Sequence, residues 1–169
     1  MTSQTANVLN MRTDVESLET GIESAKSLAA SLSACLADSY LLMVKTQAYH
    51  WNAVGPLFHS IHLLTEEHYT NLFGAVDELA ERIRALGYPA PSSFTEMATS
   101  TGLVEDTDNP TTETMIGNLV ADHQTVARRF RAAIVRAEDH KDVVTADMLT
   151  ERIRFHEKAI WMLRAFLSR

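Results

Sequence analysis

The sequence contains a single cysteine, Cys35, among its 169 residues. One cysteine cannot form a disulfide within the chain, so a reducing compartment such as the cytoplasm is the default expectation. Cys35 falls within an apolar helical pattern, which predicts an inert side chain in the core. No apolar run approaches the ~18 residues that span a bilayer, and the beginning of the chain lacks the basic and apolar segments of a signal peptide.

Positive charge is also scarce. Fifteen Lys and Arg residues against 22 Asp and Glu residues give a formal net charge of −7 at pH 7. An acidic surface is repelled by the phosphate backbone, so the composition argues against non-specific binding to nucleic acid. The first 24 residues carry one basic side chain, Arg12, and no basic extension follows the last predicted helix. The charge suits a protein that attracts cations.

The chain shows no alternation typical of strands and no internal repeat. Residues 1–15 are polar and without a clear period, which predicts a flexible N-terminal tail ahead of one domain over residues 16–169. Apolar residues recur at intervals of three and four, which predicts long amphipathic helices. These helices are expected at about 15–49, 57–86, 110–137 and 145–167.

The ends of these helices carry recognisable signals. Gly87 is placed to cap the second helix, and Asn109 and Thr145 are expected to begin the third and fourth. Between the second and third helices lies a long connection in which Ser93 and Glu96 have the spacing of a capping box, which predicts a short helix over residues 94–99. Four long helices with one long middle connection predict an all-α, ferritin-like four-helix bundle.

Metal-ligating residue types gather at helical spacing between positions 50 and 81. His62 and Glu66 are four residues apart, and so are Asp77 and Glu81, so each pair occupies one helix face. His50 ends the first helix, and a tight hairpin would bring it beside His62. Mixed imidazole and carboxylate ligands suit Fe(II), Zn(II) or Mn(II).

The two pairs are too far apart to share an ion within one chain. Fifteen residues separate His62 from Asp77, which is ~22 Å along a helix. If the helix packs antiparallel against its own copy near residues 71 and 72, the first pair of one chain meets the second pair of the other, and a two-fold axis creates two equivalent sites. The spacing therefore predicts a metal site between subunits.

Other interpretations remain open from spacing alone. His62 and Glu66 could be a surface pair. Asp77 and Glu81 could be solvated, with Glu81 paired to Arg82 or Arg84. A di-iron site in the bundle core would need Glu-x-x-His twice within one chain. No histidine here has Glu three residues before it, which argues against a core site of that type and favours a site between subunits.

A longer motif contains these residues and resembles the Dps proteins (DNA-binding proteins from starved cells), also called mini-ferritins. The resemblance covers residues 18 to 169 roughly. It includes the short helix in the middle connection and the ending Ile160-Trp161-Met162-Leu163. The motif reads His50-Trp51-Asn52-x-x-Gly55-x-x-Phe58-x-x-x-His62, followed by Asp77-Glu78-Leu79-Ala80-Glu81-Arg82-Ile83.

The resemblance implies a hollow shell of twelve subunits that oxidises Fe(II), usually with hydrogen peroxide, and stores the ferric mineral. It assigns His50, His62 and Glu66 to one subunit's half of each iron site. Asp77 and Glu81 come from the partner, with Asp77 either a direct ligand or a group that orients one. Position 66 is often Asp in the family, and Glu is one methylene longer.

Further residues take roles from the same resemblance. Trp51 matches a tryptophan that can supply an electron during peroxide reduction, although packing at an interface is the alternative. The stretch from Asp142 to Asp147 resembles one that lines acidic three-fold pores, and Glu151 lies one turn beyond Asp147 on the same face. The alternative is that acidic residues at a helix start stabilise the helix dipole. His59 and His68 could form a second metal position, with solvated or core roles as the alternative. No partner is evident for His123, His140 and His156.

Three functions compete at this point. The first is an iron-oxidising store that protects DNA by consuming Fe(II) and peroxide, in which DNA binding is weak or absent. The second is a DNA-condensing nucleoid protein with little ferroxidase activity. The third is a shell that buffers zinc or manganese, because the ligands do not exclude these metals. The complete ligand set and the non-basic tail favour the first.

Overall fold

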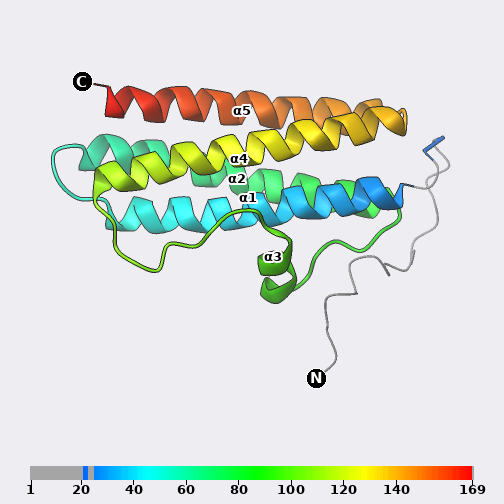
Figure 1. Cartoon of the computed structure of the whole chain (residues 1–169), viewed down its shortest axis with the longest axis horizontal. Coiled ribbons are helices and arrows are strands. Elements are labelled where there is room, and N and C mark those ends of the chain that lie inside the picture. The colour runs from blue at the N-terminus through cyan, green and yellow to red at the C-terminus, as the bar shows by residue number, and fades with distance from the viewer. Residues whose placement is uncertain (1–20, 23–24, 169) are drawn as a thin grey trace.

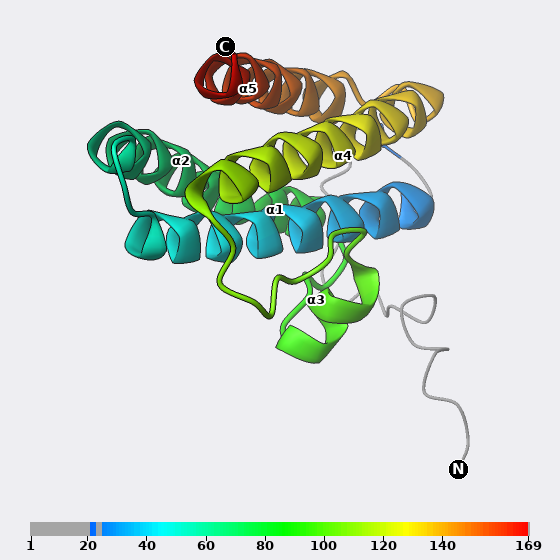
Figure 2. The same ribbon diagram turned by 60° about the vertical axis from the view of Figure 1, so that its left-hand side comes forward.

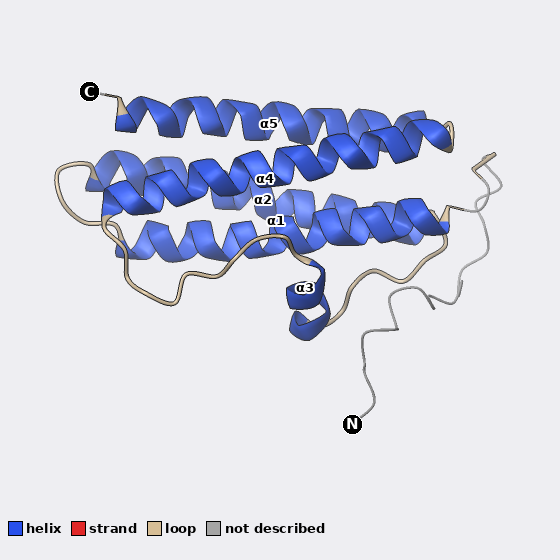
Figure 3. Ribbon diagram, in the orientation of Figure 1, coloured by secondary structure: helices blue, strands red, loops and turns tan. Residues whose placement is uncertain are grey.

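The computed structural model describes residues 21–22 and 25–168, and Figure 1 shows that this part of the chain is built from helices. Within these residues there is no strand, which confirms the predicted all-α class (Figure 3). Four long helices and one short one follow each other along the chain: α1 (Lys26–Asn52), α2 (Phe58–Ala85), α3 (Phe94–Ser100), α4 (Thr112–Asp139) and α5 (Val143–Leu167).

The long helices form two antiparallel hairpins, α1 with α2 and α4 with α5, and α1 also packs against α4. The connection from α2 to α4 runs the length of the bundle, and α3 lies in this connection against α1 (Figures 1 and 2). This arrangement is the predicted four-helix bundle with a short helix in the long crossover. It places α2 beside α1, with one face of α2 left uncovered by the rest of the chain.

Two helix starts differ from the sequence prediction. The N-cap of α4 is Thr111, whose side chain accepts a hydrogen bond from the Thr114 backbone N–H, and not Asn109. The N-cap of α5 is Asp142, whose carboxylate accepts from the Thr145 N–H at 3.0 Å. In both places two residues with capping side chains lie within three positions of each other, so local pattern alone does not choose between them.

The other end signals agree with the prediction. Gly87 has φ +87° directly after α2, and the Tyr88 N–H donates to the Ile83 carbonyl at 3.2 Å, as in a Schellman motif. Ser93 caps α3 as expected. The first helix was predicted from residue 15, but α1 begins at Lys26, and the predicted tail over residues 1–15 lies outside the described residues.

The core is formed by apolar side chains from all four long helices. Cys35 is fully buried in it, and burial raises the pKa of its thiol far above the ordinary value, which agrees with an inert packing role. The largest core side chains include Leu28, Leu32 and Leu42 of α1, Leu72, Leu79 and Ile83 of α2, Phe130 of α4, and Leu149 of α5.

The prediction that no segment is apolar enough to span a membrane is wrong for α1. By length and composition this helix qualifies, although more than half of its most apolar window is buried inside the bundle. A helix that packs against several neighbours is apolar on more than one side. The composition of α1 is thus explained by its packing against α2, α3 and α4.

Two buried polar clusters attach the crossover to the bundle. Asp38 on α1 is fully buried and accepts hydrogen bonds from the Thr101 hydroxyl at 2.8 Å and the Gly102 N–H at 2.7 Å. Arg129 of α4 completes this first cluster, with its Nε 3.2 Å from the Asp38 carboxylate. The first anchor therefore fixes the chain immediately after α3.

The second cluster is centred on Lys45, which is 8% exposed. Its ammonium donates to the Val104 carbonyl at 2.9 Å and to the Asp122 carboxylate of α4 at 2.8 Å, and it lies 3.2 Å from Asp106. The Tyr49 hydroxyl donates to the same Asp106 carboxylate. The far part of the crossover is therefore held on α1 by a buried cation shared among three acceptors.

Candidate metal centre

The α1–α2 hairpin brings His50 and His62 together, as the short loop predicted. Their rings are stacked, with centroids 3.7 Å apart and planes inclined by 17°. His50 Nδ1 donates to the His62 backbone carbonyl at 2.8 Å, and His62 Nδ1 donates to the His50 backbone carbonyl at 3.0 Å. The two residues therefore fix each other through reciprocal hydrogen bonds across the hairpin.

These hydrogen bonds determine the tautomer of both rings. A backbone carbonyl can only accept, so each Nδ1 carries the proton. In a neutral imidazole the other nitrogen then has a free lone pair, so Nε2 of both His50 and His62 is able to bind a metal ion. The hairpin therefore holds two imidazoles side by side, each with a lone pair available on Nε2.

Three neighbours restrict the movement of these rings. Thr65 is fully buried, and its hydroxyl donates to the Ile61 carbonyl at 2.6 Å and lies 3.4 Å from His50 Nδ1. The Tyr69 ring meets His50 edge-on at 5.2 Å, and the Phe58 ring lies 5.2 Å from His62. None of these three residues was predicted to support the site, although Thr65 and Tyr69 lie three and seven residues after His62.

The carboxylates predicted as ligands lie on the uncovered face of α2. Glu66, Asp77 and Glu81 are exposed, and within the described residues none of them forms a hydrogen bond or an ion pair. Arg82 donates instead to Asp142 and Thr145, at 2.7 Å in each case, so the suggested Glu81–Arg82 pair is absent. Unpaired carboxylates on one helix face repel each other unless a cation approaches.

The two halves of the predicted site remain apart in the single chain. His62 and Asp77 lie 15 positions apart on the continuous helix α2, which corresponds to ~22 Å, whereas metal–ligand bonds are about 2 Å long. Over residues 21–22 and 25–168, no three His, Cys, Asp or Glu side chains of one chain are arranged to hold a metal ion. Any site using all five predicted ligands therefore needs a second chain.

An exposed aromatic side chain lies between the two halves. Phe73 is 69% exposed, seven residues after Glu66 and four before Asp77, on the same face of α2. A large exposed apolar side chain within a stripe of ligand residues is typical of a surface that contacts another protein. Phe73 was not among the predicted site residues, although its position on the same helix face as Glu66 and Asp77 could have identified it.

Trp51 and His59 are both exposed beside the histidine pair. Trp51, 65% exposed, directly follows His50 at the end of α1, and His59 lies in the first turn of α2. Neither side chain makes a hydrogen bond or ring contact within the described residues. His59 thus does not join the other ligands in the single chain.

The three predicted pore residues have different environments. Asp142 is 1% exposed, binds Arg82 and caps α5, so the structure contradicts the prediction that it lines a channel. Burial alone would raise the pKa of Asp142, but hydrogen bonds from Arg82 and Thr145 lower it, and the carboxylate is ionised and already paired. Asp147 and Glu151 are exposed one turn apart, and Glu151 is 2.5 Å from Arg154.

The remaining histidines have partners that spacing did not reveal. His68 is buried, which agrees with a core role, and its ring lies 5.6 Å from that of His123. His123 in turn bonds to His156 of α5, and His140 lies 3.1 Å from the Ser27 hydroxyl. These pairs join residues at least 33 positions apart, so only the packing of the bundle brings them together.

The sequence was compared with known protein families and with individual proteins. The ferritin-like domain family matches residues 29–169. An uncharacterised low temperature-induced protein from Nostoc is 47% identical over 138 residues, which cover 79% of this chain and 75% of that protein. The DNA protection during starvation protein from Brevibacillus brevis is 32% identical over 141 residues, covering 83% of this chain and 95% of that protein.

Solved structures agree with the sequence comparisons. The crystal structure of the Dps protein from Vibrio cholerae O1 superposes with a TM-score of 0.81 at 32% identity, covering 85% of this chain and 91% of that one. That protein is described as a member of a broad superfamily of ferritin-like diiron-carboxylate proteins. All five predicted ligands lie on the α1–α2 hairpin, with His50 on α1 and the other four on α2.

Proposed function

The chain belongs to the Dps family of ferritin-like proteins, and from this premise we propose that it oxidises Fe(II) at sites shared between two subunits and stores the ferric product. The observation that carries the proposal is the division of the ligands. His50 and His62 present two fixed Nε2 lone pairs at one end of α2, whereas Asp77 and Glu81 present unpaired carboxylates ~22 Å further along.

A two-fold axis beside the middle of α2 satisfies both halves at once. Antiparallel pairing of α2 with its copy sets the His62 and Glu66 end of each chain against the Asp77 and Glu81 end of the other. Phe73 would then be buried close to the axis against its partner copy, which gives the exposed ring an apolar contact. Each dimer would have two equivalent sites.

Fe(II) is the substrate of these sites. Imidazole nitrogens and carboxylate oxygens together suit this ion, and the negative charge of Glu66, Asp77 and Glu81 favours the Fe(III) product over Fe(II). Hydrogen peroxide takes up two electrons, so two Fe(II) ions are oxidised for each peroxide reduced to water. Where one site holds a single Fe(II), the exposed indole of Trp51 beside His50 is the candidate donor of the second electron.

The stored mineral requires a closed shell. We propose that the dimers assemble into a hollow dodecamer, and that exposed Asp147 and Glu151 at the start of α5 attract iron towards openings between subunits. Glu151 is partly neutralised by Arg154, so Asp147 has the larger expected effect. Asp142 is left out of this role because it is paired with Arg82.

Protection of DNA in this proposal is chemical. Consumption of Fe(II) and peroxide removes the reactants of hydroxyl radical formation in the cytoplasm. A net charge of −7 per chain and a first segment with one basic residue give no electrostatic attraction to DNA, so condensation of DNA is not expected at physiological salt.

The test is Fe(II) oxidation by hydrogen peroxide under anaerobic conditions, followed by absorbance near 300 nm. A variant with both His62→Ala and Glu66→Ala should lose fast oxidation while its far-UV circular dichroism stays unchanged.

The matched control is His59→Ala, which removes an exposed histidine of the same helix outside the ligand set. Zinc added before iron should slow oxidation by wild type, since it binds the same ligand types. Wild-type rates in the double variant would refute the proposed site.

A further inference from the structure

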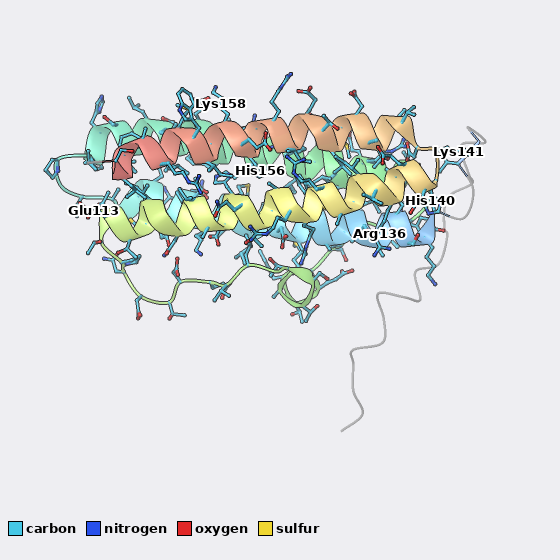
Figure 4. All side chains as sticks on the ribbon, turned by 45° about the horizontal axis from the view of Figure 1, so that its top comes forward. Glu113, Arg136, His140, Lys141, His156 and Lys158 are labelled. Carbon is cyan, nitrogen blue, oxygen red and sulfur yellow. The ribbon has the colours of Figure 1, made fainter. Side chains whose placement is uncertain are left out.

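A buried pair of histidines joins α4 to α5, separate from the residues proposed to bind iron. His123 and His156 are each fully buried, and their Nδ1 atoms are 2.8 Å apart. Their ring centroids are 5.1 Å apart. His156 lies on the inner side of α5, whereas Lys158 projects outward two residues later (Figure 4). The pair is a polar contact between two helices inside the bundle.

The hydrogen bond requires a specific number of protons. With both rings neutral, one Nδ1–H donates to the bare Nδ1 of the other ring. The donor ring then has a bare Nε2 and the acceptor ring has an Nε2–H. Both of these Nε2 atoms are buried and have no hydrogen-bond partner within the described chain. The neutral pair is therefore bonded at one point and unsatisfied at two others.

Arg152 and His68, the ionisable side chains outside the pair that influence its protonation, are cationic or can become so. Arg152 lies one turn before His156 on α5, is 8% exposed, and stacks over the Phe155 ring at 4.6 Å. Its Nε and Nη2 atoms are buried and make no hydrogen bond to any described residue. His68 approaches His123 from α2. A positive charge placed on the pair would meet another positive charge at close range.

Among the described residues, carboxylates influence this core through Arg152 and His68. Glu78 of α2 favours the charged form of Arg152, and Glu67 of α2 favours the charged form of His68, where Lys158 opposes it. On α1, Lys45 is already paired with Asp122 of α4. Burial lowers the pKa of His156 to about 3, with a further contribution from Arg152, and burial also lowers that of His123.

We propose that the His123–His156 pair is an acid-sensitive latch that holds α5 on α4 while neutral and releases it when both rings are protonated. The first added proton goes to the bare Nε2 of the donor ring and leaves the Nδ1–H···Nδ1 bond intact. The second must go to the acceptor Nδ1, which removes the only lone pair in that bond and sets two N–H groups against each other. The rings can then be satisfied only by separating into water.

The direction of the pH effect follows from the difference between the closed and open arrangements. In the open arrangement each imidazole takes a proton below about pH 6.5, whereas the closed pair resists protonation to much lower pH. The free-energy preference for the closed arrangement is thus fully present above pH 6.5 and decreases as the pH falls below 6.5. Two protons make opening about a hundredfold more favourable for each pH unit.

Hydrogen–deuterium exchange measured by mass spectrometry between pH 7.5 and 3.5, corrected for intrinsic rates, tests the latch on the full chain. In wild type, peptides from α5 and the adjoining part of α4 should lose protection before peptides from α1 and α2. A variant with His123→Gln and His156→Gln keeps a polar pair that cannot titrate, so α5 should stay protected at least one pH unit further into acid. His140→Gln, which removes a histidine outside the core, should behave as wild type.

A second variant, His123→Leu with His156→Leu, serves if the glutamine variant does not fold at neutral pH, and it should show the same acid resistance. The proposal is overturned if folded variants and wild type lose α5 protection at the same pH. It is also overturned if nuclear magnetic resonance shows either histidine titrating near pH 6.5 in the folded wild type.

Discussion

Complementation between two variants, each expected to be inactive, would show whether the proposed iron site is shared between subunits. One variant carries His62→Ala with Glu66→Ala, and the other carries Asp77→Ala with Glu81→Ala. In a dimer of either variant alone, each site contains one destroyed half. In a mixed dimer, one site combines both destroyed halves and the other combines both intact halves, because α2 runs antiparallel to its copy.

The size of the recovery follows from this geometry. Random pairing of equal amounts makes half of the dimers mixed, and each mixed dimer has one intact site of two, so about one quarter of the wild-type rate should return. A site within one chain predicts no recovery at any ratio. Because the two halves are ~22 Å apart along α2, one chain cannot supply both halves to the same ion.

The assay is anaerobic Fe(II) loading followed by peroxide, applied to variants co-expressed with different affinity tags and purified through both. Native mass spectrometry confirms the mixed composition before the rate is measured. Preassembled variants mixed without dissociation provide the control and should remain inactive. Mixed particles of verified composition that stay inactive, while co-expressed wild-type chains with the same tags oxidise iron normally, would refute the two-fold arrangement.

Two further predictions concern the stability and the reactivity of the folded chain. Replacement of Lys45 by Met leaves the half-buried Asp122 carboxylate without its cation and should lower the free energy of unfolding by about 3–5 kcal/mol in urea titrations. The control, Lys158→Met, removes a surface ion pair at 3.7 Å and should change the free energy of unfolding by less than ~1 kcal/mol. Equal effects of the two substitutions would show that the Lys45 cluster does not stabilise the fold. Cys35 should react with a thiol reagent only after unfolding, because burial raises the pKa of its thiol, and rapid labelling of the native protein followed by absorbance would contradict its place in the core.

Local geometry explains what could be predicted from the sequence. The pairs His62 with Glu66 and Asp77 with Glu81 are one helical turn apart, so their shared face follows from helix periodicity. The contact between His50 and His62 follows from a short loop between two helices. Gly87 could be placed because a left-handed residue after a helix favours glycine.

Tertiary contacts explain most of the features that could not be predicted from the sequence. Asp142 was taken for a channel residue, but Arg82, 60 positions earlier, neutralises it, and no local pattern reports such a pair. His123 and His156 are 33 positions apart and meet only because α4 and α5 pack together. The start of α4 was misplaced for a different reason, since Asn109 and Thr111 are both acceptable caps.

The manner in which the crossover is anchored makes α3 a convenient position for foreign sequence. Asp38 holds the chain just after α3, Lys45 holds it further on, and α3 itself contributes no fully buried side chain to the bundle. A peptide grafted between residues 94 and 100 would be followed by a crossover segment that the Asp38 and Lys45 clusters hold on α1. Its length and composition could therefore change without transmitting a shift to the hairpin that presents His50 and His62.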